Sequence, residues 1–452
     1  MNATIRRRMA ATVLAAAGAA VGLGLSAAPA GASTFTVSNA NASGAGSLEK
    51  AIDDANSHAG ADVIVFAPAT NGLALPEPPT IESGGPLTLQ GNGAGVTKIN
   101  GEIDINSGGS DVTTATVTGV TAGYLNINSG FGSTTTATFT NVSVTTDGID
   151  INSGFNNSKT TVTLTNVHVT GSTGINVNAG QSTTTATITN SSVDGVTGTA
   201  LNVNESSVTV TGSTFSNSEE GIDLASDSQF HMTNSTVTGN DDTGLILGSS
   251  TTLQNVTITK NNGNGVEVNG GTTTIGNSII ANNDESECSV GEGATLTSHG
   301  GNLADDASCN PIGSDHKNTP AGLGALAADG GSTKTQLPQA GSAAIDGGIA
   351  SGCPATDQRG IARPQDGDNN GSAVCDVGAV EVGKASTPTT TTVPVTATTA
   401  GTSATTTVTT AAAELPRTGS SSSGPLAAGG IFVVAGSALL LASRRRVASV
   451  TR

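Results

Sequence analysis

An apolar-polar-apolar triplet recurs along the middle of the chain, from residue 101 to residue 284. The segments that it opens, such as "GYLNINSGFGSTTTATFTNVSVTTD" and "GIDINSGFNNSKTTVTLTNVHVTGST", repeat with a period of roughly 21 to 26 residues. Each segment holds three short β-branched runs separated by Gly, Asn and Ser, without helical spacing of its apolar residues. The pattern predicts one coil of a right-handed parallel β-helix per segment, and therefore an all-β solenoid.

The first run of each coil alternates strictly between apolar and polar positions. Pairs such as Ile103 and Ile105, or Leu125 and Ile127, flank one polar residue. Because successive side chains point to opposite faces of a strand, we expect the flanking rows to fill the core and the middle row to face solvent. This exposed polar row consists of Asp104, Asn126, Asp150, Asn176, Asn202, Asp223 and Glu267, with Ile246 in one coil.

A second register is marked by asparagine at the bend that follows the second run. Asparagine tolerates left-handed backbone, and its side chain can bond the backbone of a neighbouring coil. We therefore predict a structural ladder of stacked amides. Its members are Asn141, Asn166, Asn190, Asn234, Asn255 and Asn277, with Gly119 and Gly212 in two coils.

A solenoid needs caps, because its end coils would otherwise expose the core. "GSLEKAIDDAN" predicts a short helix with Ser47 as N-cap, so residues 33–100 are interpreted as an N-terminal cap with the first strands. Residues 101–284 form the coils, and residues 285–384 are expected to close the other end. Residues 385–414 are rich in Thr, Pro and Ala and predict an extended, disordered stalk.

The N-terminal segment predicts that this solenoid is exported from the cell. Residues 1–32 carry a basic start, an apolar run and an A-x-A site, as a secretory signal peptide does. The chain has 35 acidic and 17 basic residues, a balance that repels phosphate backbones and excludes nucleic acid as a partner. Four cysteines in an exported chain favour disulfides over free thiols; of three possible pairings, short-range closure favours Cys288–Cys309 and Cys353–Cys375.

Three stretches resemble known bacterial surface proteins. "TFTVSNANASGAGSLEKAIDDAN" resembles the opening of surface β-helix proteins, although Gly46 and Glu49 replace the usual Cys and Arg of their motif. "GSAAIDGG", "DQRGIARPQDGD" and "CDVGAVE" resemble the C-terminal part of choice-of-anchor Q proteins.

The third stretch, residues 415–452, resembles a sortase sorting signal. An apolar run (426–442), expected to be a membrane-spanning helix before sorting, and a basic tail follow the motif. The resemblance implies that a sortase attacks the Thr418 carbonyl and transfers the chain to peptidoglycan, leaving a secreted protein anchored to the cell wall. The motif residues are Leu415, Pro416, Arg417, Thr418 and Gly419.

No catalytic constellation emerges from the coils. Asp104 and Asp150 lie two coils apart, about 9.6 Å, which is too far for one divalent ion to bridge. The coils contain only Lys159 and Lys260 as bases, which disfavours a lyase. "GNDDTG" (Asp241, Asp242) and "SHGG" (His299) are superficially similar to parts of the polygalacturonase pattern, but the basic substrate-binding motif expected after the His is missing.

A cation site is conceivable outside the coils. Asp366, Asp368 and Asn370 stand in D-x-D-x-N-G order, the start of a Ca²⁺ loop, although Val377 replaces the expected Glu. A Ca²⁺ site and a plain turn both remain open, and no other cofactor is expected. We interpret the protein as a non-catalytic structural or adhesive module with a glycan or extracellular protein ligand; the alternative is a wall-anchored polysaccharide lyase or glycoside hydrolase.

Overall fold

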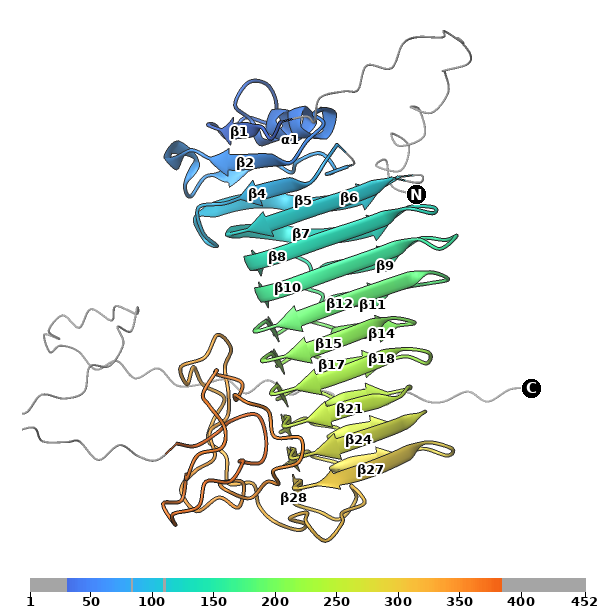
Figure 1. Cartoon of the computed structure of the whole chain (residues 1–452), viewed down its shortest axis with the longest axis vertical. Coiled ribbons are helices and arrows are strands. Elements are labelled where there is room, and N and C mark those ends of the chain that lie inside the picture. Colours follow the sequence, from blue (N-terminus) through green and yellow to red (C-terminus); the bar gives the residue numbers. More distant parts are fainter. Residues whose placement is uncertain (1–30, 83, 109–110, 384–452) are drawn as a thin grey trace, which may run out of the picture. The chain divides into compact units, whose positions relative to one another are not determined.

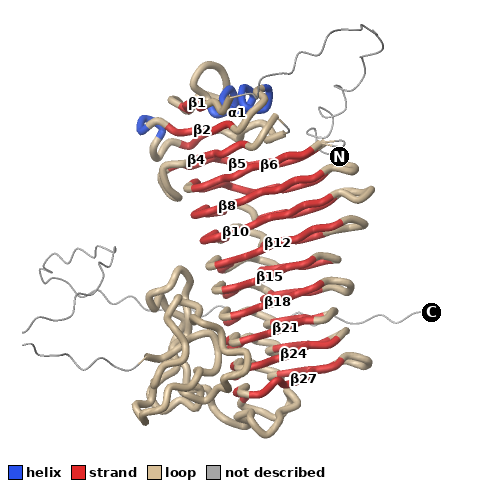
Figure 2. Tube along the Cα trace, viewed as in Figure 1, coloured by secondary structure: helices blue, strands red, loops and turns tan. Residues whose placement is uncertain are grey.

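The structure is a computed structural model that describes residues 31–82, 84–108 and 111–383. In this part, the chain winds through 28 short strands. Each strand of the solenoid pairs in parallel with the equivalent strand one coil before and one coil after it, as Figure 1 shows. Strands are stacked as rungs, and helical turns occur only near the N-terminal end in Figure 2. The predicted parallel β-helix is confirmed.

The strands form three stacks, one for each run of the repeat. The first stack holds residues 102–107 of β5 (Thr97–Ser107), residues 124–129 of β7 (Val120–Ser129), β9 (Ile149–Ser153), β11 (Ile175–Asn178), β14 (Thr199–Asn204), β17 (Glu220–Leu224), β20 (Leu245–Leu247), β23 (Val266–Val268) and β26 (Cys288–Val290). The second stack holds β1 (Thr34–Val37), β2 (Asp62–Phe66), β4 (Leu87–Gln90), β6 (Val112–Thr118), β8 (Thr134–Val144), β10 (Lys159–Val169), β12 (Thr183–Thr189), β15 (Ser207–Thr211), β18 (Gln229–Thr233), β21 (Thr251–Gln254), β24 (Thr272–Gly276) and β27 (Thr295–Gly300). The third stack begins with β3 (Ala74–Leu75), residues 97–99 of β5, residues 120–122 of β7 and the end of β8. It continues from the end of β10 through β13 (Ser192–Asp194), β16 (Thr214–Ser216), β19 (Thr236–Thr238), β22 (Thr257–Thr259), β25 (Ile279–Ala281) and β28 (Leu303–Ala304). Coils therefore extend beyond residues 101–284 at both ends.

The core is the inside of this tube. Ile103, Ile105, Leu125 and Ile127 are all fully buried, as their alternation with polar residues predicts. Each inward row stacks identical or similar aliphatic side chains from successive coils, so burial of apolar surface is repeated at every rung. Phenylalanine fills wider places, with Phe139 at 0% exposure.

The N-terminal end is covered by the predicted helix. Helix α1 (Leu48–Ser57) begins after Ser47, whose Oγ accepts a hydrogen bond from the Lys50 N–H at 3.1 Å. Leu48 and Ile52 are buried on the face that meets β1 and β2. A short 3₁₀ turn, η2 (Pro68–Thr70), follows β2.

The C-terminal region does more than close the far end. Its first part lies over the last coil, where the His316 N–H donates to the Asn302 carbonyl at 2.7 Å. The rest runs back along the flank of the solenoid, beside the third stack (Figure 1). Thr333 Oγ1 donates to the Gly212 carbonyl at 3.0 Å, about four coils before the end. We call residues 305–383 the flanking strap.

Two disulfides hold this region. Cys288–Cys309 joins β26 to the start of the flanking strap, and Cys353–Cys375 closes a loop within it. The chain contains no free cysteine. This is the pairing that short-range closure favours.

Candidate functional site

The polar row lies on the outer face of the first stack. Parallel pairing aligns its members coil by coil, from Asp104 and Asn126 through Asp150 and Asn176 to Asn202 and Asp223. Ile246 and Glu267 continue the row. Successive side chains are therefore one strand spacing apart, about 4.8 Å.

Amides of this row bridge its carboxylates. Asn126 Nδ2 donates to Asp104 Oδ1 at 3.3 Å and to Glu102 Oε1 at 2.9 Å. Asn176 Nδ2 donates to Asp150 Oδ1 at 2.8 Å. The carboxylate oxygens thus find donors within the sheet itself.

Tyr124, the single tyrosine of the chain, joins the same network. Its hydroxyl donates to Asp150 Oδ2. Burial and the neighbouring Asp150 carboxylate raise the pKa of Tyr124 well above its ordinary value, so the phenol remains protonated and serves as a hydrogen-bond donor.

Asp104 departs from the expectation that the whole row faces solvent, because it is only 7% exposed. The preceding coil covers it on one side: Ile81 bridges to Ile105, and Thr80 Oγ1 donates to Asp104 Oδ2 at 2.8 Å. Asn126 lies on its other side. Asp104 is therefore a bridge between coils and not an open ligand.

Basic groups are scarce near the row. Among the described strands that carry the row, the only lysine or arginine is Lys98 of β5, and it lies before the bulge at Ile99/Glu102, in the part of β5 that belongs to the third stack. An open cleft nearby is lined by Lys98, Gly101, Thr121 and Thr145 among others, without a carboxylate in its lining. Acidic and basic groups are thus not brought together there.

One pair of carboxyls on β17 does interact. Burial, and then the charge of Glu220, raise the pKa of Asp223. Thr199 Oγ1 donates to Glu220 Oε2 at 2.8 Å, which holds that carboxylate in place. A carboxyl with a raised pKa beside a second acidic side chain is an arrangement that acid catalysis can use.

Of the other groups weighed for catalysis, His299 lies on β27 and Asp241 and Asp242 lie in the turn after β19. His299 and these carboxyls make no side-chain hydrogen bond to one another in the described part of the chain.

The candidate cation loop brings together a different set from the predicted one. Asp346, Asp366 and Asp368 each place an oxygen within 4.8 Å of the others. Asn370 instead donates from Nδ2 to Asp368 Oδ2 at 2.9 Å. Asp346 was not predicted because it lies 20 residues before Asp366 in sequence.

The hydrogen bonding of these carboxylate oxygens fits a bound cation only in part. Asp366 Oδ1 is buried without a hydrogen-bond partner, whereas Asp346 Oδ2 accepts the N–H groups of Gly367 and Asp368 at 3.0 and 2.9 Å. Ca²⁺ takes six to eight oxygens, so backbone carbonyls or water would have to complete the shell. Ca²⁺ at this loop remains a prediction.

The asparagine ladder lies at left-handed backbone, with φ between 47° and 54°. Its first members bond along the ladder, since Asn166 Nδ2 donates to Asn141 Oδ1. Its last three members bind the flanking strap instead: Asn234 Nδ2 donates to the Thr356 carbonyl at 2.6 Å, Asn255 to Asp376 at 3.1 Å and Asn277 to Ile349 at 2.9 Å. Sequence periodicity placed the ladder but not these partners.

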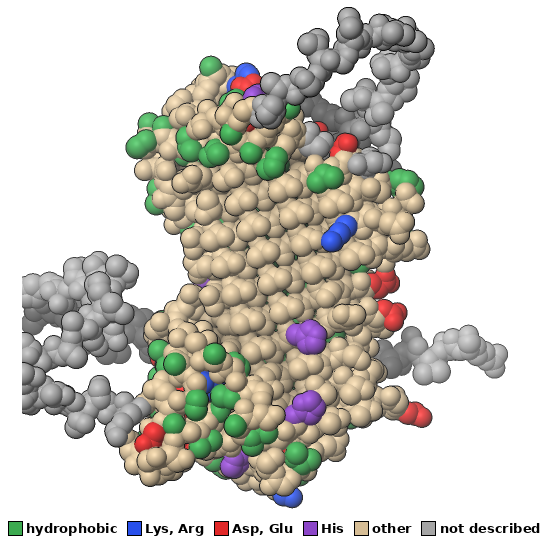
Figure 3. Space-filling view, in the orientation of Figure 1, with side chains coloured by type: hydrophobic (Ala, Val, Ile, Leu, Met, Phe, Trp, Pro, Cys, Tyr) green, Lys and Arg blue, Asp and Glu red, His purple; other side chains and the backbone are tan. Residues whose placement is uncertain are grey.

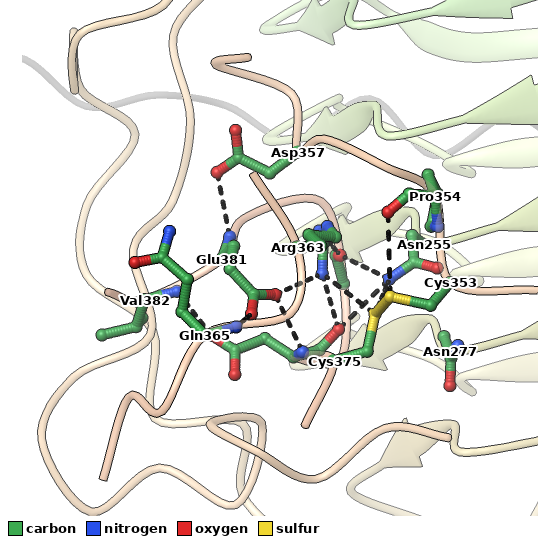
Figure 4. A network of polar contacts seen from close by, with 12 residues as sticks. Asn255, Asn277, Cys353, Pro354, Asp357, Arg363, Gln365, Cys375, Glu381 and Val382 are labelled. Carbon is green, nitrogen blue, oxygen red and sulfur yellow. Dashed lines mark hydrogen bonds and ion pairs between the residues drawn. A yellow bond between two sulfur atoms is a disulfide. The ribbon is translucent and has the colours of Figure 1, made fainter. Parts of the chain in front are cut away.

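A buried ion pair lies within the strap, close to the ladder residue Asn255, as Figure 4 shows. Arg363 Nη1 lies 3.0 Å from Glu381 Oε2, and both side chains are fully buried. Arg363 also donates to the carbonyls of Asp376 and Gly378 at 2.8 and 2.7 Å. Asn255 donates to the same two carbonyls.

A second ion pair supports this one. Arg359 binds Asp357 Oδ2 at 2.7 Å, and the same oxygen accepts the Glu381 N–H at 2.9 Å. Asp357, Arg359, Arg363 and Glu381 therefore hold segments of the strap to one another. No role had been assigned to these four residues from the sequence.

Two regions match family models. Residues 147–306 match the model described as "Right handed beta helix region", and residues 407–449 match the "LPXTG cell wall anchor motif". Neither region includes residues 307–406, so the likeness of the strap to choice-of-anchor Q proteins remains a prediction. No curated protein matches the chain.

Two solved structures are similar in fold. Pectate lyase Pel9A matches 77% of this chain and 96% of its own length, at 15% identity and a TM-score of 0.38. The PL6 family alginate lyase AlyGC matches 68% of this chain at 13% identity and a TM-score of 0.32, and the match spans 55% of that lyase. Likeness at this level carries no argument about function.

The chain thus contains a right-handed parallel β-helix and a cell wall anchor motif. It is a cell-wall-anchored surface protein, and its motif implies processing by a sortase and attachment to peptidoglycan. Residues 1–30 of the predicted signal peptide (1–32), the predicted stalk (385–414), the motif residues 415–419 and the apolar run (426–442) lie outside the described residues. Among the described residues, no helix has the length and apolarity to cross a membrane.

Proposed function

We propose that this protein is a non-catalytic adhesive module, which a sortase attaches to peptidoglycan and which displays its solenoid on a stalk. The hydrogen bonding of the polar row carries the proposal. The Asp104 carboxylate accepts hydrogen bonds from Asn126 and Thr80. The Asp150 carboxylate accepts hydrogen bonds from Asn176 and Tyr124. Carboxylates engaged in this way stiffen a surface, whereas a catalytic site directs them at a substrate.

The charge arrangement supports the same conclusion. A lyase needs a base beside the carbon that loses a proton and a positive group that neutralises the neighbouring carboxylate. The described strands that carry the polar row offer Lys98 alone, and it lies beyond a bulge in the third stack. The polar row is instead a line of amides and carboxyls that bond one another along the sheet.

A polysaccharide-cleaving enzyme is the second candidate, and the pair Glu220 and Asp223 favours it. Asp223, with its raised pKa, would act as the acid and Glu220 as the second carboxylate. Both lie on β17, and Asn202 and Ile246 are the neighbours of Asp223 in the row.

The two candidates separate in one experiment. Mature protein is incubated with alginate, pectate and cell-wall glycans, and both unsaturated products and new reducing ends are measured. We expect no turnover, and equal signals for the native protein and the Asp223→Asn and Glu220→Gln variants. Turnover that either substitution abolishes would establish the enzyme and end the non-catalytic proposal.

Anchoring is tested separately in the producing cells. Thr418→Ala removes the residue whose carbonyl the sortase is expected to attack, so the protein should leave the wall fraction and collect in the membrane or the medium. Leu426→Ala, a conservative change in the apolar run, should leave wall attachment intact. Wall attachment of the Thr418→Ala protein would contradict the sorting mechanism.

A further inference from the structure

The outer face of the second stack is a regular array of threonine. On β6, β8, β10, β12 and β15, three neighbouring outward positions are occupied almost entirely by this residue, with Ser207 continuing one column. We call this the threonine face. Its columns are Thr114, Thr136, Thr161 and Thr185; Thr116, Thr138, Thr163, Thr187 and Thr209; and Thr118, Thr140, Thr165, Thr189 and Thr211.

The array is regular in two dimensions. Pairing from β6 to β15 keeps one register along these columns, so each hydroxyl lies one strand spacing, about 4.8 Å, from the next in its column. Neighbouring columns are two residues apart along the strand, about 6.6 Å. The strands lie as nearly parallel arrows in Figure 1.

The array is also rigid. Threonine is β-branched and has few χ1 states, and its backbone is fixed here by two neighbouring strands. The inward side chains between the columns, such as Ala137 and Phe139, are buried at 1% and 0% exposure, so the core supports the face from beneath. Such a surface loses little conformational entropy when it binds a partner.

The hydroxyls of the threonine face are available. No Oγ1 of the three columns hydrogen-bonds another group in the described part of the protein, although the inward threonines of the same strands do. Thr135 Oγ1, for example, donates to the Asn128 carbonyl at 2.7 Å. The outward hydroxyls are half-buried and turn to solvent, so water is their partner.

The charge of the threonine face indicates which kind of ligand it can bind. The chain has 35 acidic residues, yet the five strands carry none, and their single lysine or arginine is Lys159, outside the three columns. Figure 3 shows this surface as an almost unbroken field of uncharged atoms without a deep hollow. A charged polysaccharide or mineral would meet no opposite charge, so charge matching requires a neutral partner.

A neutral partner with hydrogen-bonding groups at two fixed repeats of this size is crystalline water. The oxygen atoms of a hexagonal ice face also repeat in two dimensions, at distances of the same order as the two spacings of the array. Threonine supplies a hydroxyl that hydrogen-bonds such an oxygen and a methyl group that confines the water beside it. Each contact is weak, and many act at once because all are held by one rigid sheet.

We propose that the threonine face binds ice, and that the wall-anchored solenoid thereby attaches a cell to an ice surface. This inference rests on the proposed adhesive function and names its ligand. The face occupies one side of the solenoid, and the flanking strap contacts the bends beyond it, at Gly212 and Asn234, and leaves the columns uncovered.

The test measures partition of fluorescently labelled mature protein into a slowly growing ice hemisphere, together with thermal hysteresis. Native protein should be enriched in the ice and should shape ice crystals. Thr163→Tyr places a bulky ring at the centre of the face and prevents close approach, so the enrichment should be lost. Thr163→Val keeps the shape and removes one hydroxyl, and should cause a smaller loss.

Thr274→Tyr is the matched control. Thr274 lies on β24 in the same stack and outside the threonine face, beyond the interruption at His231 on β18. It should keep full enrichment and the circular dichroism of the native protein. Equal losses in Thr163→Tyr and Thr274→Tyr, or native protein that is excluded from ice while folded, would overturn the proposal.

Two further measurements distinguish a failure of ice binding from a failure of the proposed adhesive function. Binding to crystalline cellulose or chitin, with exclusion from ice, would overturn ice as the ligand and leave an adhesive. Polysaccharide turnover that depends on Asp223 would overturn the non-catalytic function, whatever the ice measurement gives.

Discussion

Replacement of Arg363 by methionine should be the most destabilising single change in the flanking strap. The side chains of Arg363 and Glu381 are both fully buried, with nitrogen and oxygen 3.0 Å apart. The substitution also removes hydrogen bonds to the carbonyls of Asp376 and Gly378. It leaves Glu381 with two backbone N–H donors, those of Gln365 and Asp376, and no positive charge.

The magnitude follows from the uncompensated carboxylate. Removing one partner of a buried ion pair lowers the free energy of unfolding by about 3–5 kcal/mol. The double variant Arg363→Met/Glu381→Leu removes the buried charge as well, so part of the loss should return. Recovery is incomplete, because the two N–H groups then lose their acceptor.

Equilibrium urea unfolding of the mature protein, followed by circular dichroism, measures both variants. Limited proteolysis with mass spectrometry shows whether residues 305–383 detach first. Lys50→Met, which breaks the exposed pair with Asp54, is the control and should change stability by less than about 1 kcal/mol. If Arg363→Met unfolds within about 1 kcal/mol of the native protein, the ion pair does not hold the strap.

Three further predictions concern the same region. Asn255→Gly should lower the free energy of unfolding by about 1–3 kcal/mol, because the buried amide of Asn255 binds the strap. Asn141 is exposed and has a similar φ, so Asn141→Gly should change the free energy of unfolding by less than about 0.5 kcal/mol. Equal effects of the two substitutions in urea unfolding would refute the difference. Reduction of either disulfide should lower the free energy of unfolding by about 3 kcal/mol, since each closes a loop of 21 or 22 residues. Calorimetry with and without reductant measures this loss, and an unchanged Tm would contradict it. Stability should fall as the pH rises from about 4 to about 8. Burial raises the pKa of Glu287 to about 8 and that of Asp376 to about 7, so the folded state holds protons that the unfolded state releases. A Tm that rises across this range in calorimetry, with the same pH dependence in the Glu287→Gln variant, would refute the reasoning.

Most of the solenoid could be predicted from the chain alone because its interactions repeat. A period-2 alternation sets which side chains enter the core, and a period of roughly 21 to 26 residues sets which residues stack. Ile103, Leu125 and Ile149 could therefore be aligned, and the structure pairs them. Left-handed geometry at the asparagine bends follows from the residue type, since asparagine reaches positive φ readily.

The polar row shows where the pattern stops being informative. Alternation places Asp104 and Asp150 on the outer face, but it is silent on their partners. The amide bridges from Asn126 and Asn176, and the cover that Thr80 provides over Asp104, depend on side-chain positions in adjoining coils. A row that looked like an open set of ligands is therefore largely a set of internal contacts.

The sequence by itself determined the coil, the faces of its strands and the address on the cell wall, because each is a local or periodic pattern. Only the tertiary structure decided where the flanking strap lies, which carbonyls Arg363 and Asn255 share and which carboxyls lie near Asp366. These contacts join segments that do not repeat and, for Asn255 and Asp376, are 121 residues apart. Their free energy comes from burial and hydrogen bonding after the chain has folded back, so no period in the sequence records them.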